Sequence, residues 1–504
     1  MRVSAAVALA VAVVVGLTAP SAEAAVAKVS GVTSVSADWY NSKLTVRWKA
    51  VRGTIYQVRW ASSKAGLARA KPIAARVPRA TSPTLNRCVT SYVQVRAFKG
   101  RVAGKWSTPK GLRFTNKRAN PVAMTGTGIT DGVTFSWPYT SFASRYRVLW
   151  NAAPFGRFPG AATYVGGGWF GQTARSATLK LPTVPKIGDK MMGVAYANPV
   201  YAQMQANNAC KPTDIPHNQF IYAFPKAPDP GTGDKFRVGT YNVEANPTGA
   251  RLATIADNIG DHGLQVVLLQ EANAATAESV ARALGSTWSK VDSILASDQQ
   301  ILYRNTYFDL VANNTFEVGP NPRPPNKPLV TPWARLKVKD ADPAAVERSV
   351  IVSSVHFLEN TAASAYSQKA STGVQARDAI AELARINRDN VPVIVGGDFR
   401  YKREPFCDEP ACDIEAPPTF VRGGYYDAMA AVTKVNFKYP TNQDNHSTSV
   451  ANASGVATRA DYLMLKGFRG SLRYENVINR FLPGTRTTPS DHNLVLADVV
   501  LPAP

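Results

Sequence analysis

The sequence has 504 residues and a formal net charge of +23, with 58 Lys and Arg against 35 Asp and Glu. At about 150 residues per domain, this length predicts about three domains, each large enough to bury its own core. After residue 24 no apolar run approaches the roughly 20 residues of a membrane-spanning helix, so the sequence predicts no transmembrane segment.

Residues 1–24 predict a secretion signal. A basic residue near the start precedes an apolar run over residues 3–17, and the small-x-small sequence AEA at 22–24 forms a cleavage site. We therefore expect a secreted, extracellular, soluble protein that is a monomer.

The four cysteines fit an oxidising compartment. Cys407 and Cys412 lie close together in an acidic, Pro-rich stretch, and we expect them to form a disulfide. Cys88 and Cys210 either pair or stay free. A zinc site is the alternative, but no second Cys/His pair at zinc spacing lies nearby, so structural disulfides are favoured.

The excess positive charge lies entirely in the first half of the chain. Residues 1–231 hold 30 Lys and Arg against 6 Asp and Glu, whereas residues 232–504 hold 28 against 29. Such a field attracts nucleic acid, anionic lipid surfaces or acidic cell-wall polymers. A basic, soluble surface without a specific partner is the alternative.

One pattern of aromatic and apolar residues occurs twice in this basic half. Within each copy apolar residues alternate with polar ones, as in strands with one buried face, and no helical period appears. Each copy therefore predicts an all-β sandwich of roughly a hundred residues, with its aromatic residues mostly in the core. The repeated residues are Trp48, Tyr56, Val58 and Trp60 in the first copy and Trp137, Tyr146, Val148 and Trp150 in the second.

The two copies resemble fibronectin type III modules, over residues 31–115 and, less closely, over residues 120–224. An early Trp, a Tyr-x-Val strand, a Leu before the late strand and a closing WSTP at 106–109 carry the resemblance, and the Gly-rich segment 166–168 is an insertion. Such modules imply a spacer or binding role. Residues 225–235 follow, with the composition of a linker.

Residues 236–504 alternate apolar strands with amphipathic helices. The strands are predicted at 236–243, 266–271, 299–304, 349–357, 391–398, 459–466 and 489–501, and the helices near 252–259, 277–284 and 375–387.

The strand at 391–398 ends in Gly396, Gly397 and Asp398, after an apolar run that predicts burial on both faces. We expect the glycines to let the backbone turn where it leaves the sheet, with Asp398 at the strand end. A carboxylate there is rigidly placed for positioning a metal ion or a water. Taken alone, an ordinary turn is the alternative.

Further polar residues lie at or beside the ends of apolar strands, where most sheet residues are apolar. Carboxylate and amide oxygens suit Mg²⁺ or Mn²⁺, and a histidine can hydrogen-bond a phosphate oxygen, so this set predicts phosphoryl chemistry. The residues are Asn242, Glu271, His356, Asp398, Asp461, Asp491 and His492.

In this order the segments TYNV, LLQE, ILYR, SVHF, GGDFR, RADY and SDH resemble the endonuclease/exonuclease/phosphatase superfamily, which includes the DNase I-like nucleases. The resemblance covers about residues 236–501, which places the catalytic domain at 236–504. It implies a multidomain chain in which two all-β fibronectin type III-like sandwiches precede a four-layer α/β sandwich.

The resemblance also implies a divalent cation, Mg²⁺ or alternatively Mn²⁺ or Ca²⁺. It assigns Asn242, Glu271 and Asp491 to the metal, and Glu244 matches a position that is acidic in some members.

The implied catalytic residues surround the attacked phosphorus. Asp398 would orient or deprotonate the attacking water, and Asp461 would hold His492 in one orientation. His492 and His356 would contact the phosphate, and Asp491 would lie against both metal and nucleophile.

Arg400 departs from the family pattern, which usually has Asn two residues after the GDF aspartate. An arginine can bind phosphate bidentately and substitute for that Asn, or it can point away and leave catalysis impaired.

The sequence therefore predicts a secreted, metal-dependent phosphodiesterase, foremost a nuclease that hydrolyses extracellular DNA or RNA. One alternative is a sphingomyelinase-like or inositol-phosphate-type phosphoesterase, because the site identifies a bond and not a molecule. The other is a polyanion- or cell-wall-binding protein with an idle catalytic domain.

Overall fold

The computed structural model describes most of the chain after residue 24. The described residues are 25–38, 41–114, 124–129, 132–138, 143–151, 166–171, 173–180, 200–208, 219–227, 229–245, 247–292, 297–319, 329–339, 348–358, 365–400, 415–443, 451 and 457–502. The predicted secretion signal lies outside them, as do Cys210, Cys407 and Cys412. Cys88 is described, and it is disulfide-bonded.

The chain divides into two compact units. One comprises residues 1–120 with 140–144 and 207–216, and the other comprises 121–139, 145–206 and 217–504. Most of the second predicted sandwich thus belongs to the same unit as the C-terminal region, whereas residues 140–144 and 207–216 belong to the first unit. The finer boundaries at 31–115, 120–224, 225–235 and 236–504 stay predictions.

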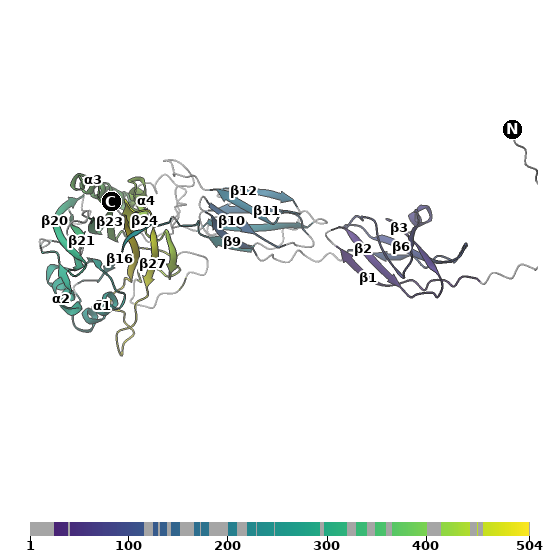
Figure 1. Ribbon diagram of the computed structural model, residues 1–504, viewed down its shortest axis with the longest axis horizontal. Helices are drawn as coiled ribbons and strands as arrows, with labels where there is room; N and C mark the ends of the chain where they lie inside the picture. The colour runs from purple at the N-terminus through teal and green to yellow at the C-terminus, as the bar shows by residue number, and fades with distance from the viewer. Residues whose placement is uncertain are drawn as a thin grey trace, which may run out of the picture. The chain divides into compact units, whose positions relative to one another are not determined.

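The first unit consists of two sheets over one apolar core (Figure 1). Trp48, Tyr56 and Trp60 are buried in that core, as the alternating pattern predicts. One sheet contains β1 (Val32–Asp38), β2 (Lys43–Trp48) and β5 (Arg79–Thr81). The other sheet contains β4 (Ile73–Ala75), β3 (Ile55–Ala61), β6 (Ser91–Lys99) and β7 (Val102–Ala103), and β8 (Lys110–Leu112) also pairs with β6. A short 3₁₀ helix, η1, spans Ala65–Arg69.

The second copy again has two sheets and the same buried Trp–Tyr pair. Ring centroids lie 5.2 Å apart for Trp48 and Tyr56 and 5.5 Å apart for Trp137 and Tyr146, and all four of these residues are core residues. The Gly-rich segment predicted as an insertion is instead part of β12, which pairs with β11. The three-stranded sheet has the order β13 (Ser176–Lys180), β10 (Gly132–Ser136) and β9 (Thr125–Ile129). The four-stranded sheet has the order β12 (Gly166–Gly171), β11 (Ala143–Asn151), β14 (Val200–Asn208) and β15 (Gln219–Ala223).

The C-terminal region holds two larger sheets, each mostly antiparallel. The seven-stranded sheet has the order β18 (Trp288–Lys290), β19 (Gln299–Arg304), β17 (Val266–Gln270), β16 (Gly233–Asn242), β28 (Leu494–Pro502), β27 (Ser471–Val477) and β25 (Ala431–Val435). The six-stranded sheet has the order β20 (Phe308–Val318), β21 (Leu329–Val338), β22 (Ser349–His356), β23 (Val393–Asp398), β26 (Asp461–Lys466) and β24 (Tyr426–Asp427).

The two sheets share one core, and helices cover their other faces. Val238 and Leu268 of the seven-stranded sheet belong to the same apolar cluster as Val352 and Ile394 of the six-stranded sheet. Separate clusters join α1 and α2 to the first sheet and α3 and α4 to the second, and Figure 1 shows the two helix pairs apart. The helices are α1 (Gly249–Asp261), α2 (Ala274–Leu284), α3 (Ala365–Ile386) and α4 (Ala416–Arg422).

Gly396 and Gly397 do not form the predicted turn, because β23 continues through both to Asp398. They are needed for close packing. A Cβ on Gly396 would lie 2.7 Å from methyl groups of Leu268 and Leu463, and one on Gly397 would lie against the Val355 carbonyl oxygen. Gly396 therefore lets the two sheets approach each other immediately before Asp398, and Gly397 lets β23 lie close to β22 within its own sheet.

Strand β16 begins at Gly233, inside the segment 225–235 predicted as a linker. Just before it, the Phe224 ring packs edge-on against Phe437 with centroids 5.1 Å apart, and Lys434 Nζ lies 4.7 Å from the Phe224 ring centre. The end of the second sandwich is thus in contact with the segment after β25. No helix among the described residues is long and apolar enough to cross a membrane.

Candidate active site

Strand register brings the predicted residues to one edge of the two sheets. β22 and β23 are parallel with His356 opposite Asp398, and β26 runs antiparallel to β23 with Asp461 opposite Asp398. On the other sheet, β16 ends at Asn242 beside β17, and Glu271 follows β17 directly. Because parallel strands end at the same edge, polar residues that terminate them must converge.

Asp398 is the residue on which the others converge. Its side chain is fully buried, and nitrogen atoms surround its carboxylate. The Asn242 amide donates to Oδ2 at 3.3 Å, joining the two sheets. Nε2 of His356 and Nε2 of His492 each lie 3.6 Å from Oδ2, and the Arg400 backbone N–H donates to Oδ1 at 2.8 Å.

Burial raises the pKa of Asp398, but the His492 imidazolium, the neighbouring His356 ring, the Arg400 guanidinium and the Arg400 N–H hydrogen bond together outweigh that effect and leave the pKa below its usual value. The carboxylate is therefore ionised at neutral pH. It can accept a hydrogen bond from a water molecule, but it is a weak base.

Asp461 holds His492 in a fixed orientation. His492 Nδ1 lies 2.9 Å and 3.0 Å from the two carboxylate oxygens of Asp461. Both side chains are buried, and Thr441 Oγ1 accepts a hydrogen bond from the Asp461 backbone N–H at 3.2 Å. The proton on Nδ1 therefore faces Asp461, and Nε2 is turned toward Asp398.

The pKa values of this pair both lie above their usual values. Burial alone would lower the pKa of His492, but Asp461 and Asp398 raise it to about 10. Burial raises the pKa of Asp461 to about 6, although His492 opposes the shift. At neutral pH the pair is therefore an imidazolium facing a carboxylate.

His356 differs from His492 in its charge. Burial lowers its pKa more than the neighbouring Asp398 carboxylate raises it, so the ring is neutral at pH 7. The two imidazoles that face Asp398 are thus a cation and a neutral ring. This pairing allows one to donate a proton and the other to accept one.

Glu271 is held by hydrogen bonds to both of its carboxylate oxygens. The Asn242 amide donates to Oε1 at 3.1 Å, and the Ala245 backbone N–H donates to Oε2 at 3.2 Å. The Asn242 amide oxygen accepts from the Glu244 N–H at 3.0 Å. Glu244 itself forms an ion pair with Arg251 at 3.1 Å, so its carboxylate is directed to a cation of the chain.

Arg400 points into the site and not away from it. Its Nη2 lies 3.3 Å from His356 Nε2 and 3.6 Å from Glu271 Oε1, and its Nε lies 3.5 Å from Asp398 Oδ2. The guanidinium therefore stands between two carboxylates. Of the two alternatives for this residue, the geometry favours a role in the site.

No preformed divalent-metal site is seen among the described residues. Among the described residues no three His, Cys, Asp or Glu side chains are grouped so as to hold a metal ion. The Asn242 oxygen and both Glu271 oxygens are engaged with N–H donors of the chain. Asp491 lies with Oδ1 3.9 Å from His492 Nε2. A metal site of Asn242, Glu271 and Asp491 remains a prediction.

Asn442 is a site residue that the sequence pattern did not indicate. Its Nδ2 lies 2.7 Å from His492 Nε2, at an isolated bridge between the two residues. The amide serves either state of the ring, because it can present its nitrogen to a neutral imidazole or its oxygen to an imidazolium. The sequence offers little indication of this residue, because the polar segment TNQD at 441–444 shows neither helical nor strand periodicity of apolar residues.

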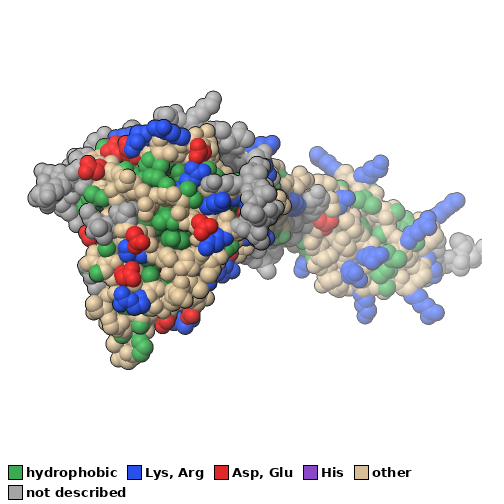
Figure 2. Space-filling model, turned by 60° about the vertical axis from the view of Figure 1, so that its left-hand side comes forward, with side chains coloured by type: hydrophobic (Ala, Val, Ile, Leu, Met, Phe, Trp, Pro, Cys, Tyr) green, Lys and Arg blue, Asp and Glu red, His purple; other side chains and the backbone are tan. Residues whose placement is uncertain are grey.

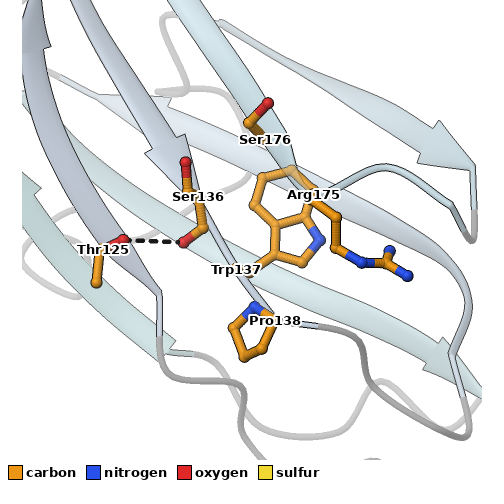
Figure 3. Close-up of a pocket in the computed structure, with 6 residues that line it drawn as sticks. All are labelled: Thr125, Ser136, Trp137, Pro138, Arg175 and Ser176. Carbon is orange, nitrogen blue, oxygen red and sulfur yellow. Dashed lines mark hydrogen bonds between the residues drawn. The ribbon is translucent and has the colours of Figure 1, made fainter.

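A cavity of about 400 Å³ lies elsewhere, in the second sandwich (Figure 3). Trp137, Pro138 and Arg175 line it together with small polar residues, and the Arg175 guanidinium donates to the Ala174 carbonyl oxygen. It contains no carboxylate or imidazole, so it does not have the chemistry of the strand-end cluster.

Comparison with known proteins gives structural similarity only. No family model matches the sequence, and no curated protein matches it. An endonuclease/exonuclease/phosphatase from Bacteroides vulgatus matches at 18% identity and a TM-score of 0.41, covering 53% of this chain and 100% of that one.

Two further solved structures match to a similar degree. Truncated TDP2 from Caenorhabditis elegans matches at 16% identity and a TM-score of 0.38, covering 53% of this chain and 98% of that one. Beta toxin 275–280 from Staphylococcus aureus matches at 13% identity and a TM-score of 0.38, covering 52% and 99%. Likeness of this degree does not identify an activity, which has to be argued from the site residues.

Proposed function

We propose that residues 236–504 form a phosphoric ester hydrolase with the four-layer α/β sandwich of the endonuclease/exonuclease/phosphatase superfamily. The observation that carries the proposal is the buried Asp398 carboxylate, which has nitrogen atoms of His356, His492, Asn242 and Arg400 within 3.6 Å. An anionic acceptor surrounded by cationic and neutral donors suits attack of water on a phosphate group.

In this mechanism Asp398 orients the attacking water by accepting one of its hydrogen bonds. The low pKa of Asp398 makes orientation its main contribution, since a weak base removes a proton only late in the reaction. Placement of the water by a carboxylate on a strand end also lowers the entropy cost of the attack.

His492 donates from Nε2 to a phosphate oxygen as negative charge develops there. Asp461 keeps the imidazolium oriented and charged, which makes this a charge-assisted hydrogen bond. The neutral His356 and the Arg400 guanidinium lie within 3.6 Å of the same Asp398 oxygen and complete the set of groups that contact the phosphate.

We propose nucleic acid, extracellular DNA or RNA, as the substrate of a secreted enzyme, because the chain carries a strongly cationic module. Residues 25–114 contain 18 Lys and Arg but one acidic residue, Asp38. Figure 2 shows Lys and Arg projecting from the β-sandwich part of the chain, whereas acidic and basic side chains are mixed on the C-terminal region.

Within that module an arginine–tryptophan stack offers a defined anion site. The guanidinium carbons of Arg59 and Arg96 lie 4.1 Å and 4.4 Å from the Trp106 ring centre. Each guanidinium donates two hydrogen bonds to a glutamine, Gln94 or Gln57, and not to a carboxylate. Burial and the charge of Arg96 lower the pKa of Arg59, so a bound anion would stabilise this pair.

We therefore assign the fibronectin type III-like module a polyanion-binding role. The Trp106 stack also suits a base or a sugar ring, because a π-face and two guanidinium planes favour stacking. The alternative ligand for the same face is an anionic cell-wall polymer, which would be recognised through the same positive charges.

The experiment that tests the activity is a substrate panel. Plasmid DNA, single-stranded RNA, sphingomyelin and an inositol phosphate are incubated with the full chain in Mg²⁺, Mn²⁺, Ca²⁺ or EDTA. Asp398→Asn is the inactive comparison, and Asp309→Asn, on an exposed side chain, is the matched control. Cleavage of nucleic acid that Asp398→Asn abolishes and Asp309→Asn retains supports the proposal.

Other outcomes separate the alternatives. Turnover confined to sphingomyelin or the inositol phosphate would move the protein to the corresponding phosphoesterases. Polyanion binding without turnover of any substrate would establish a binding protein with an idle catalytic domain.

A further inference from the structure

Arg400 places a positive charge next to Glu271, the residue to which the family resemblance assigns a divalent metal. Arg400 Nη2 lies 3.6 Å from Glu271 Oε1, and Nε lies 3.5 Å from Asp398 Oδ2. Each distance falls within the range of an ion pair. One guanidinium therefore balances two carboxylates that come from different sheets.

One hydrogen bond, from Arg400 Nη2 to His356 Nε2 at 3.3 Å, accounts for only part of this placement of the guanidinium. Arg400 Nε is buried, and it has no hydrogen-bond partner among the described residues. A buried N–H without a partner costs free energy, so the electrostatic attraction of Glu271 and Asp398 has to outweigh that cost. This favours a guanidinium held as a counter-ion in the absence of another cation.

Glu271 and Arg400 both have a strained backbone conformation with a positive φ angle. Glu271 has φ +55° and Arg400 has φ +54°, in the left-handed region that residues other than Gly, Asn and Asp rarely adopt. Non-glycine residues persist there only when their surroundings fix them, and such strain clusters at functional sites. The hydrogen bond from the Arg400 N–H to Asp398 fixes the backbone here.

We propose that Arg400 occupies the cation position of this site and competes with a divalent cation for the carboxylate of Glu271. A metal ion on Oε1 would lie beside the guanidinium, and two cations so close repel each other. Metal binding therefore requires the Arg400 side chain to swing away. This inference concerns ion binding and does not depend on the chain being a hydrolase.

The competition predicts that removing the charge of Arg400 improves metal affinity. Asn is the favoured replacement, since it tolerates the left-handed backbone, and Gln keeps most of the side-chain length. For both Arg400→Asn and Arg400→Gln we expect Mn²⁺ to bind at least about tenfold more tightly than to the unchanged chain at low ionic strength.

The measurement is a Mn²⁺ titration of the full chain, followed by calorimetry and by the electron paramagnetic resonance of free Mn²⁺. Arg385→Gln, which removes a positive charge at a largely exposed position, should leave the affinity unchanged. Adding Glu271→Gln to Arg400→Asn should abolish the gain. Two uncharged replacements are used so that a folding defect in one, detected by circular dichroism, does not end the test.

Equal Mn²⁺ affinity of the unchanged chain and both uncharged variants would overturn the proposal. Failure of every variant to bind Mn²⁺ would overturn it as well, because no metal site would exist for Arg400 to guard. A gain in affinity without hydrolysis of any substrate would support the competition while contradicting the proposed enzyme.

Discussion

His492 Nδ1 lies 2.9 Å from Asp461 Oδ2, and both side chains are completely enclosed although they come from different sheets. β26 begins at Asp461, and His492 lies two residues before β28. The contact therefore fixes the edge of one sheet against the edge of the other at the position where Asp398 is located.

The first prediction concerns this contact. Asp461→Asn keeps the shape of the side chain but removes the charge that orients the imidazolium, so we expect kcat to fall by about 10²- to 10⁴-fold. Nitrogen NMR of His492 should show that its Nδ1 proton is no longer fixed.

A second buried carboxylate provides the control for Asp461→Asn. Asp427 is paired with Arg459 at 2.5 Å and is not one of the residues that contact Asp398. Asp427→Asn should lower the free energy of unfolding by about 3–5 kcal/mol, because it leaves a buried cation unpaired. It should not lower the kcat of the protein that remains folded, and an equal loss of kcat in both variants would assign Asp461 a merely structural role.

The second prediction concerns the glycine that lets the sheets approach. Gly396→Ala places a Cβ 2.7 Å from methyl groups of Leu268 and Leu463, which we expect to destabilise the protein by about 1–3 kcal/mol. Gly260, on α1, is the comparison, because we expect the same substitution there to increase stability. Its added Cβ would meet only Leu284, at an ordinary 3.6 Å, so Gly260→Ala should stabilise by about 0.5–1 kcal/mol. Urea unfolding midpoints measure both, and shifts in the same direction would refute the packing argument.

The strands that carry the site could be predicted because each is a continuous apolar run that ends in a polar residue. β17 before Glu271 and β23 before Asp398 are fully buried, as predicted. The hairpin of β20 and β21 could not be predicted, because β21 contains Pro332, which usually excludes a strand, and β20 is half exposed. The sequence also could not separate a glycine turn from close packing at Gly396.

The site was predictable as a set of residues but not in its contacts. Strand-end positions indicated Asp398 and His356, because strand register fixes their place. The direction of a long side chain is not fixed in this way, so the position of the Arg400 guanidinium required the structure. Asn442 comes from an irregular loop and contacts His492 only through tertiary packing.

The third prediction concerns pH and Lys434. Burial lowers the pKa of Lys434 to about 8, although Asp427 opposes the shift. The unfolded chain has the usual pKa near 10.5, so between pH 8 and pH 10.5 the unfolded state binds a proton that the folded state does not. The contribution of Lys434 to stability should therefore improve as pH rises through this window, by on the order of 1–3 kcal/mol.

Lys434→Met isolates this effect, because methionine keeps the stem without the charge. Unfolding free energies of both proteins are compared at pH 7 and at pH 10. We expect Lys434→Met to be the more stable at pH 7 and its advantage to shrink at pH 10. A constant difference would show that Lys434 does not titrate in this range.

The fourth prediction concerns the cationic module. Arg59→Gln with Arg96→Gln should weaken binding of single-stranded DNA by the full chain and reduce the dependence of log K on log salt by about one to two, because up to two phosphate contacts are lost. Arg282→Gln, on an exposed side chain of the C-terminal region, removes the same kind of charge as a control. An unchanged salt slope in the double variant would place the polyanion contact elsewhere.

The most direct test of the catalytic role of Asp398 is the rate at which the full chain cleaves a simple phosphodiester, bis(4-nitrophenyl) phosphate, with and without the Asp398 carboxylate. Asp398→Asn preserves the shape of the side chain and removes the charged acceptor, so we expect kcat/KM to fall by at least about 100-fold, whereas Asp309→Asn should leave it unchanged. A rate in Asp398→Asn within about threefold of the unchanged chain would contradict the assignment of this cluster as the active site.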